Sequence, residues 1–422
     1  MRVDSLYESC RHAHGRSLRG QLLLLAVVAT VCALGFHFFG TATGIRTSAS
    51  EIYPAPVGAA SMSAYMRRMP PPSIGCTPAQ RDAQAKAFTE ANAQAGGKYR
   101  ASSCPSIAIL AALQAVDPSA GGMLDLVNVG ANKGYGVAEV MALWRPDLGV
   151  TPKSVHADLK EAYPDANPRK ILGVCWDGNE VVPEPATTAA LPTLTVHAVE
   201  PLPVNVPLLQ RLARSVLDAR PSPRARMTVH PGAVGPDADA KLGYNPVSCA
   251  AVGGEACQME PLREGLTAVT GWTLDSFFEE HSLFLQGPAG DHSAPGPVIA
   301  LTPRPRRSIF LKIDAEGYDG AILINSKTGP GSALDAVRAV EFEYHRVGKW
   351  GLEVDQVRLE DVVTKLDGAG MDCYLEYADK LVHLTGTCWT SAYEFFSWSN
   401  VLCVRRGDVW ADVASHLAVW KI

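Results

Sequence analysis

The hydrophobic pattern of the chain beyond residue 105 consists of short apolar runs separated by longer amphipathic stretches. The runs predict strands at Leu126–Val129, Leu194–Glu200, Met227–His230, Ile309–Asp314 and Ala339–Tyr344. A run with helical periodicity, SIAILAALQAV, precedes the first of them, and two strand-like pieces near the C-terminus predict an antiparallel hairpin. Strands that alternate with helices predict an α/β fold with a mostly parallel sheet and helices on both faces.

A different pattern occupies the N-terminus, where Leu22–Phe39 is an almost uninterrupted apolar run of about eighteen positions, long enough to cross a membrane as a helix. Four arginines precede this run, whereas the next basic residue after it is Arg46. The positive-inside rule then predicts a single-pass type II membrane protein whose main domain is extracellular or faces the lumen of the Golgi or the ER. A cleaved signal peptide is the alternative, because the small residues of GTATG follow the run, and the protein would then be secreted.

These patterns divide the chain into five segments. We expect a cytoplasmic tail at 1–20, a transmembrane anchor at 21–39, an Ala/Ser/Pro-rich stem at 40–104, one α/β domain at 105–407 and a C-terminal helix at 408–422. Two stretches within the domain, 145–192 and 287–307, are long for connections in such a fold. We expect both to be surface excursions beside the site.

Composition narrows the choice of function. A net charge of -5 without a long basic run argues against a general nucleic-acid binder, which would have to neutralise phosphates. The ten cysteines include no C-x-x-C pair and no histidine at zinc-ligand spacing, so we expect no metal site. Eight of the cysteines follow the apolar run, and they are compatible either with disulfides or with buried thiols.

The segment LVNVGANKGYG places a strand directly before Gly130 and Gly134, and a helical stretch follows. A glycine turn between a strand and a helix lets the backbone approach a ligand at the carboxyl end of a sheet. The spacing is not the G-x-G-x-x-G of dinucleotide sites, which disfavours a nicotinamide cofactor. A tight turn without a ligand remains the alternative.

The second predicted strand, LTVHAVE, ends in an acidic residue, Glu200. Parallel strands end at the same edge of a sheet, so its carboxylate should lie in the same crevice as the glycine turn. A carboxylate there can accept hydrogen bonds from both ribose hydroxyls of an adenosine. The alternative is a solvated strand end.

Six motifs, taken in order, resemble those of FkbM-type methyltransferases: VGANKG, VHAVEPLPVNVPLL, HPGAVG, TLDSFFEE, LKIDAEGYDGAIL and VEFEYH. The likeness covers about residues 107 to 407, and it departs from the family at Asn128, where an aspartate is more usual. The resemblance implies a seven-stranded class I methyltransferase sheet, S-adenosylmethionine as methyl donor and usually an oxygen acceptor. It implies that Gly130, Ala131, Asn132 and Gly134 surround the methionine moiety and that Glu200 binds the ribose.

Transfer of a methyl group to an alcohol requires a base within reach of the hydroxyl. Asp314 and Glu316 follow the strand at 309–314, beside the expected donor pocket, and we expect Asp314 to be the base with Glu316 assisting. Glu343 and His345 are further candidates after the next strand. The alternative for Asp314 is that it caps the helix beginning near Tyr318.

The sequence therefore predicts an S-adenosylmethionine-dependent O-methyltransferase. Its expected substrate is a small-molecule or glycan hydroxyl compound of the secretory pathway. A nicotinamide-dependent oxidoreductase and a catalytically silent lumenal binding module are the alternatives. Lys312, inside an apolar strand, should pair with a neighbouring carboxylate, because a lone buried ammonium is costly.

Overall fold

The computed structural model describes residues 75–94, 106–116, 122–164, 191–218, 224–237, 241–249, 257, 259–284, 307–344, 350, 357–377, 380–394 and 399–418. All of them belong to one compact unit, Val57–Ile422. No helix among them is both long and apolar enough to span a bilayer. The tail, the anchor at 21–39 and most of the stem lie outside the described residues.

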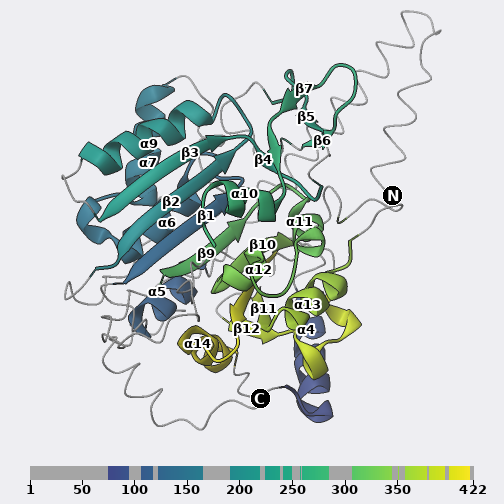
Figure 1. Ribbon diagram of the computed structural model, residues 1–422. Helices are drawn as coiled ribbons and strands as arrows, with labels where there is room; N and C mark the ends of the chain where they lie inside the picture. Colours follow the sequence, from purple (N-terminus) through teal and green to yellow (C-terminus); the bar gives the residue numbers. More distant parts are fainter. Residues whose placement is uncertain are drawn as a thin grey trace, which may run out of the picture. The chain divides into compact units, whose positions relative to one another are not determined.

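The centre of this unit is an eight-stranded sheet (Figure 1) with the order β12-β11-β13-β10-β9-β1-β2-β3. The strands are β1 (Met123–Val129), β2 (Thr193–Glu200), β3 (Ala225–Pro231), β9 (Arg307–Ile313), β10 (Ala339–Tyr344), β11 (Met371–Tyr377), β12 (Lys380–His383) and β13 (Ser399–Arg405). From β3 to β10 every neighbouring pair is parallel. The five strands of this parallel part, β1, β2, β3, β9 and β10, are the five runs predicted from the sequence, so the prediction of a mostly parallel sheet is confirmed.

The C-terminal strands differ from the expected seven-stranded sheet. The strand β13 is antiparallel to both β10 and β11, and β11 also pairs antiparallel with β12. The short strand β12 is thus an eighth strand at the edge, and the expected total of seven was wrong. The segment 380–383 pairs antiparallel with Tyr374–Tyr377 of β11, so it extends the sheet by one strand.

Helices cover both faces of the sheet, as predicted. One face carries α5 (Ser106–Val116), α6 (Tyr135–Trp144), α7 (Pro152–Ala162), α9 (Val206–Asp218) and α14 (Val409–Leu417), with the 3₁₀ turn η2 (Pro146–Leu148) after α6. The other face carries α4 (Pro78–Gln94), α10 (Leu274–Glu280), α11 (Asp319–Asn325), α12 (Ala333–Ala336) and α13 (Leu359–Gly368), with η5 (Gly386–Cys388) and η6 (Ser391–Tyr393) beside α4.

Two cores result from the side-chain alternation of the strands. In β1, Val127 and Val129 pack in one core, whereas Leu124 and Leu126 pack in the other. Because both faces are covered, the central strands β1 and β10 are buried along almost their whole length, whereas β3 at the edge alternates between buried and exposed residues. The predicted pairing of Lys312 is confirmed, because its ammonium group forms an ion pair with the buried carboxylate of Glu341 on β10.

Between β3 and α10 the chain forms two small sheets. One joins β4 (Ala233–Val234) to β8 (Gly271–Trp272), and the other joins β6 (Glu260–Pro261), β5 (Leu242–Tyr244) and β7 (Thr267–Val269). We call residues 241–269 the flap. A disulfide between Cys249 and Cys257 closes a loop within it.

Two further disulfides, Cys76–Cys388 and Cys373–Cys403, lie among the described residues. The choice that the sequence left open between disulfides and free thiols is therefore decided for these six cysteines.

The strand order defines where a ligand should bind. From β1 the chain adds β2 and β3 on one side of the sheet, and it then crosses to add β9 and β10 on the other side. The order therefore reverses between β1 and β9. Open α/β sheets bind ligands at such a reversal, just beyond the carboxyl ends of the strands.

Candidate functional site

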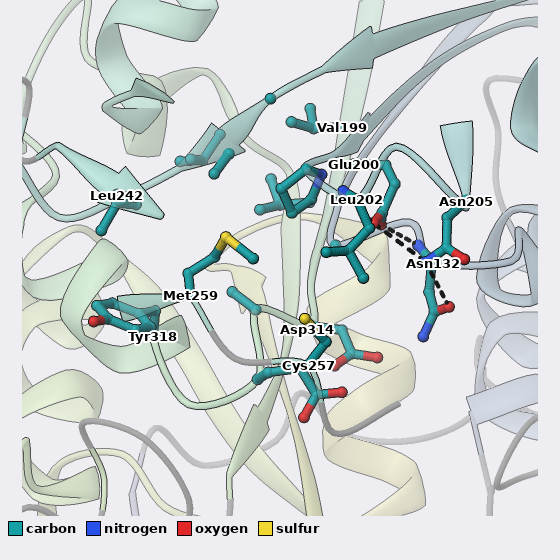
Figure 2. Close-up of a pocket in the computed structure, with 18 residues that line it drawn as sticks. Asn132, Val199, Glu200, Leu202, Asn205, Leu242, Cys257, Met259, Asp314 and Tyr318 are labelled. Carbon is teal, nitrogen blue, oxygen red and sulfur yellow. Dashed lines mark hydrogen bonds between the residues drawn. The ribbon is translucent and has the colours of Figure 1, made fainter. Parts of the chain in front are cut away.

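A cleft lies beyond the carboxyl ends of β1, β2 and β9, at the point where the strand order reverses. Among its lining residues are Gly130 and Asn132 after β1, Glu200 at the end of β2, and Asp314 and Glu316 after β9. Residues far apart in the sequence therefore meet as predicted from the strand ends. Figure 2 shows Glu200, Asn132 and Asn205 gathered on one side of the cleft, opposite Leu242, Met259 and Tyr318.

The glycine turn after β1 lies tightly against both neighbouring strands. The amides of Gly130 and Ala131 both donate to the carbonyl oxygen of Val199 at a distance of 3.0 Å. The amide of Asp314 donates to the carbonyl oxygen of Val129. Gly130 has φ +75°, and a Cβ atom there would overlap the carbonyl group of Asp314. Only glycine fits this position, because any side chain would force the two loops apart.

Three non-glycine residues in the described part of the chain have left-handed backbones, and two of them line the cleft. These are Asn132 with φ 47° and Glu316 with φ 50°. Asparagine tolerates this conformation, whereas glutamate adopts it at a cost of about 1 kcal/mol or more. Strained backbone of this kind concentrates at ligand sites, where the surrounding structure holds it in place.

Glu200 is the central polar group of the cleft and is only 2 % exposed. Its carboxylate accepts hydrogen bonds from the amide of Asn132 at 2.7 Å, the amide of Leu202 at 2.9 Å and the side-chain amide of Asn205 at 3.3 Å. Burial raises the pKa of Glu200 to about 7, although these three hydrogen bonds oppose the rise. Glu200 therefore holds the loops after β1 and β2 together and titrates near neutral pH.

Asn205, immediately before α9, joins the same network. Its side-chain nitrogen donates to Asn132 and Glu200, while its side-chain oxygen is buried without a hydrogen-bond partner in the structure. A buried acceptor without a partner is costly, and such atoms in a cleft are commonly satisfied by a bound ligand. Asn205 thus offers an acceptor to a ligand that carries a hydroxyl or an amino group.

The loop between β9 and α11 carries the acidic residues predicted to act in catalysis. Asp314 does not take the expected place at the start of α11, which has Tyr318 as its N-cap residue without a side-chain cap. Asp319 instead accepts hydrogen bonds from the amides of Ala315 and Gly317, at 3.2 and 3.1 Å. The reading of Asp314 as a helix cap was therefore wrong, because the first-turn aspartate of α11 folds back onto the loop.

A fourth carboxyl group reaches this loop from β10. Glu343 forms a side-chain hydrogen bond with Asp314, and burial together with the charges of Asp314 and Asp319 holds its pKa well above the ordinary value. Burial and the charge of Asp314 also raise the pKa of Asp319, to about 7. Two carboxyl groups that share a hydrogen bond hold one proton between them, and the raised pKa of Glu343 favours its protonated form.

The opposite wall of the cleft is apolar and comes mainly from the flap, with Leu242, Met259 and Cys257 among its lining residues. Tyr318, from the loop before α11, completes it. Behind the cleft, Gly232 packs directly on the ring of Trp272, where no Cβ would fit. A wall of this composition suits a flat, apolar group such as an aromatic base.

The structure gathers most of the predicted site residues but not all of them. Gly130, Asn132, Glu200, Asp314 and Glu316 line the cleft. Ala131 is instead buried in a core, and Gly134, with φ 93°, precedes α6 against the side chains of Leu209 and Leu212. His345 lies outside the described residues.

Sequence reasoning missed Asn205 and the residues of the flap. Asn205 lies within the motif VHAVEPLPVNVPLL, five residues after Glu200, and its place between a strand end and an amphipathic helix was a usable signal. Leu242 and Met259 gave no comparable signal, because Leu242 begins a strand of only three residues and Met259 lies just before a strand of two.

Comparisons with protein-family models, with curated proteins and with solved structures found no match to this chain.

Proposed function

We propose that the protein is an S-adenosylmethionine-dependent methyltransferase that acts on a hydroxyl group of a carbohydrate or another secretory-pathway compound. One observation carries the proposal. The cleft at the reversal of strand order brings together a glycine turn after β1, a carboxylate at the end of β2 and an acidic loop after β9. The first two features can bind a donor that contains a nucleoside, and the acidic loop next to them can supply a general base.

The fold supports this proposal through its strand content. The resemblance to FkbM-type methyltransferases implies a seven-stranded, mostly parallel sheet, and seven strands in the order β11-β13-β10-β9-β1-β2-β3 remain once the edge strand β12 is set aside. Four of the six motifs behind that resemblance, VGANKG, VHAVEPLPVNVPLL, HPGAVG and LKIDAEGYDGAIL, contribute lining residues to the cleft. VGANKG forms the turn after β1, and LKIDAEGYDGAIL forms β9 with its acidic loop.

The residues of the cleft fit this donor. Gly130 allows the loops after β1 and β9 to meet at the edge of the cleft, and Glu200 can accept a further hydrogen bond from a ribose hydroxyl. The unpartnered oxygen of Asn205 can accept another. Met259 and Leu242 offer apolar contacts to an adenine ring.

The chain's own groups would perform the acid–base part of the reaction. When bound, S-adenosylmethionine supplies an electrophilic methyl group on a positively charged sulfur, and a neutral thioether remains after transfer. Asp314 accepts the proton of the acceptor hydroxyl as the new C–O bond forms. Glu343, whose raised pKa favours its protonated form, is hydrogen-bonded to Asp314 and orients that carboxylate. The apolar wall at Leu242 and Met259 limits competing water.

The disulfides support the lumenal orientation that we propose together with the function. Three of them occur within the described residues, and disulfides persist in oxidising compartments. We propose a type II topology, in which the anchor at 21–39 attaches the protein to the membrane and the methyltransferase domain is lumenal.

Calorimetry with the full chain tests the cofactor. We expect binding of S-adenosylmethionine and of its demethylated product, and no binding of NAD. Binding of NAD alone would favour the oxidoreductase, and absence of all binding would refute the proposal. A bound donor with no transfer to any extracted glycan or lipid would favour a silent binding module.

Transfer of a labelled methyl group to extracted glycans and lipids tests the assignment of roles. Asp314→Asn should leave donor affinity nearly unchanged and slow transfer by about 10²-fold or more. Glu200→Ala should weaken donor binding. Asp361→Asn, an exposed carboxylate on α13, is the matched control and should behave like the wild type. Equal activity of Asp314→Asn and the control would remove the proposed base.

A further inference from the structure

A second cluster of reactive side chains lies away from the cleft, where the start of α4 meets the C-terminal part of the sheet. Cys76 precedes α4, His383 ends β12 and Cys388 ends η5. Their ligand atoms all lie within 4.8 Å of one another, and the two sulfurs form the Cys76–Cys388 disulfide. Cys76 lies 312 residues before Cys388, so no zinc-ligand spacing in the sequence could reveal the cluster.

The position of His383 is unusual for a residue beside a purely structural disulfide. Its Nδ1 lies 3.2 Å from Sγ of Cys388, and its Nε2 is buried without a hydrogen-bond partner in the structure. The ring is held by stacking on Tyr374, with centroids 4.8 Å apart and planes 20° apart. A disulfide sulfur is a weak acceptor, whereas a thiolate or a metal ion would interact strongly with this imidazole.

The two cysteines are held together by more than their covalent bond. The amide of Cys76 donates to the hydroxyl of Thr387 at 3.0 Å, and that hydroxyl donates back to the carbonyl of Cys76 at 2.9 Å. Phe88 on α4 is fully buried and packs edge-on against Tyr393, with ring centroids 5.4 Å apart. Breaking the disulfide would therefore leave both sulfurs beside His383.

We propose that Cys76, Cys388 and His383 form a redox-gated site for a thiophilic metal ion, closed as a disulfide and able to bind Zn²⁺ when reduced. Two thiolates and one imidazole are a typical donor set for zinc. The side-chain oxygen of Gln84, 3.8 Å from Sγ of Cys76, lies close enough to contribute a fourth ligand or to orient a water. This inference does not depend on the proposed methyltransferase activity.

The chemistry balances with an external reductant of the thiol or phosphine class. Two electrons from the reductant break the S–S bond and, with two protons, give two thiols. Binding of Zn²⁺ then releases both thiol protons to the buffer, while Nδ1 of His383 binds as a neutral ligand and its ring proton resides on Nε2. Oxidation reverses the sequence and expels the metal.

Cobalt substitution tests the site in the full chain, reduced with a phosphine under anaerobic conditions and then freed of reductant. We expect Co²⁺ to give sulfur-to-cobalt charge-transfer absorption in the reduced protein and none in the oxidised protein. His383→Ala and Cys76→Ser should each weaken Co²⁺ binding by about tenfold or more. The double variant Cys249→Ser/Cys257→Ser, which removes a disulfide with no histidine bonded to it, should bind Co²⁺ like the wild type.

A second measurement uses the wild-type chain, so its result does not depend on whether the variants fold. Zn²⁺ should slow alkylation of Cys76 and Cys388 in the reduced protein, as followed by mass spectrometry of peptides, while Cys249 and Cys257 react at unchanged rates. Equal rates with and without Zn²⁺ at all four positions would overturn the proposal. Charge-transfer bands that persist in both His383→Ala and Cys76→Ser would overturn it as well.

Discussion

Replacing Glu200 by glutamine tests whether this carboxyl group titrates near neutral pH because it is buried. Glutamine has nearly the same shape, keeps one acceptor oxygen and cannot ionise. The pKa of Glu200 rises from 4.5 to about 7, which at about 1.4 kcal/mol per pKa unit corresponds to roughly 3 kcal/mol. Because the folded-state pKa is raised, this stability is fully present below pH 4.5 and is lost as the pH rises through 7.

The expected result is a change in the pH dependence of unfolding. Between pH 5 and pH 8, the free energy of unfolding of Glu200→Gln should gain roughly 2 to 3 kcal/mol relative to the wild type. At pH 5 the free energies of unfolding of the two proteins should differ by about 1 to 3 kcal/mol at most. The difference arises because the glutamine side-chain nitrogen faces a backbone amide that donates to the carboxylate in the wild type. Urea denaturation at four pH values measures both quantities.

Donor binding supplies the second readout of the same substitution. An ionised Glu200 is the better acceptor for a ribose hydroxyl, so affinity for S-adenosylmethionine should increase as the pH rises through 7 in the wild type. In Glu200→Gln this increase should disappear, and at pH 8 the Kd should be about tenfold higher. If the free energy of unfolding changes with pH in the same way in both proteins, the pKa argument is refuted. An unchanged Kd for S-adenosylmethionine in Glu200→Gln would refute the ribose contact.

Three further predictions concern groups around the cleft and in the core. Gly130→Ala should destabilise the fold by more than about 2 kcal/mol and abolish donor binding, because its Cβ meets the adjacent loop. The control is Gly265→Ala, where φ is +86° and the space around the residue is open, so only backbone strain should lower its stability. Urea denaturation compares the free energies of unfolding of the two variants. Burial and the neighbouring His281 lower the pKa of His230 to about 4, so stability should be lost as the pH falls from 6.5 toward 4, and the melting temperature of His230→Phe should fall less over that range. Lys312→Met should lower the free energy of unfolding by about 3 to 5 kcal/mol, because it leaves the buried Glu341 without its cation. Adding Glu341→Leu should restore most of this stability, and a double-mutant cycle measures the coupling.

The sequence predicted the central part of the fold because each buried parallel strand is a short apolar run. It also predicted that Glu200 and the turn at Gly130 would meet, since parallel strands end at one edge of the sheet. The pairing of Lys312 followed from the cost of a lone buried ammonium. Each of these predictions depends on local pattern together with one general rule.

Other features were beyond the reach of local pattern. The flap strands of two or three residues show no measurable alternation, so Leu242 and Met259 could not be placed at the cleft. The sequence offered Asp314 as a cap of α11, and nothing in the local pattern showed that Asp319 would instead bind the amides of the preceding loop. The partner of Cys76 is 312 residues away, and spacing carries no information at that distance.

The Cys76–Cys388 bond has a consequence for the order of events during synthesis. At roughly 5 to 20 residues per second, its second cysteine emerges about 15 to 60 seconds after its first. Several other cysteines appear in that interval, and each is a competing partner for Cys76 under oxidising conditions. The correct bond therefore cannot form before synthesis has reached Cys388, which makes this disulfide a late event in the formation of the domain.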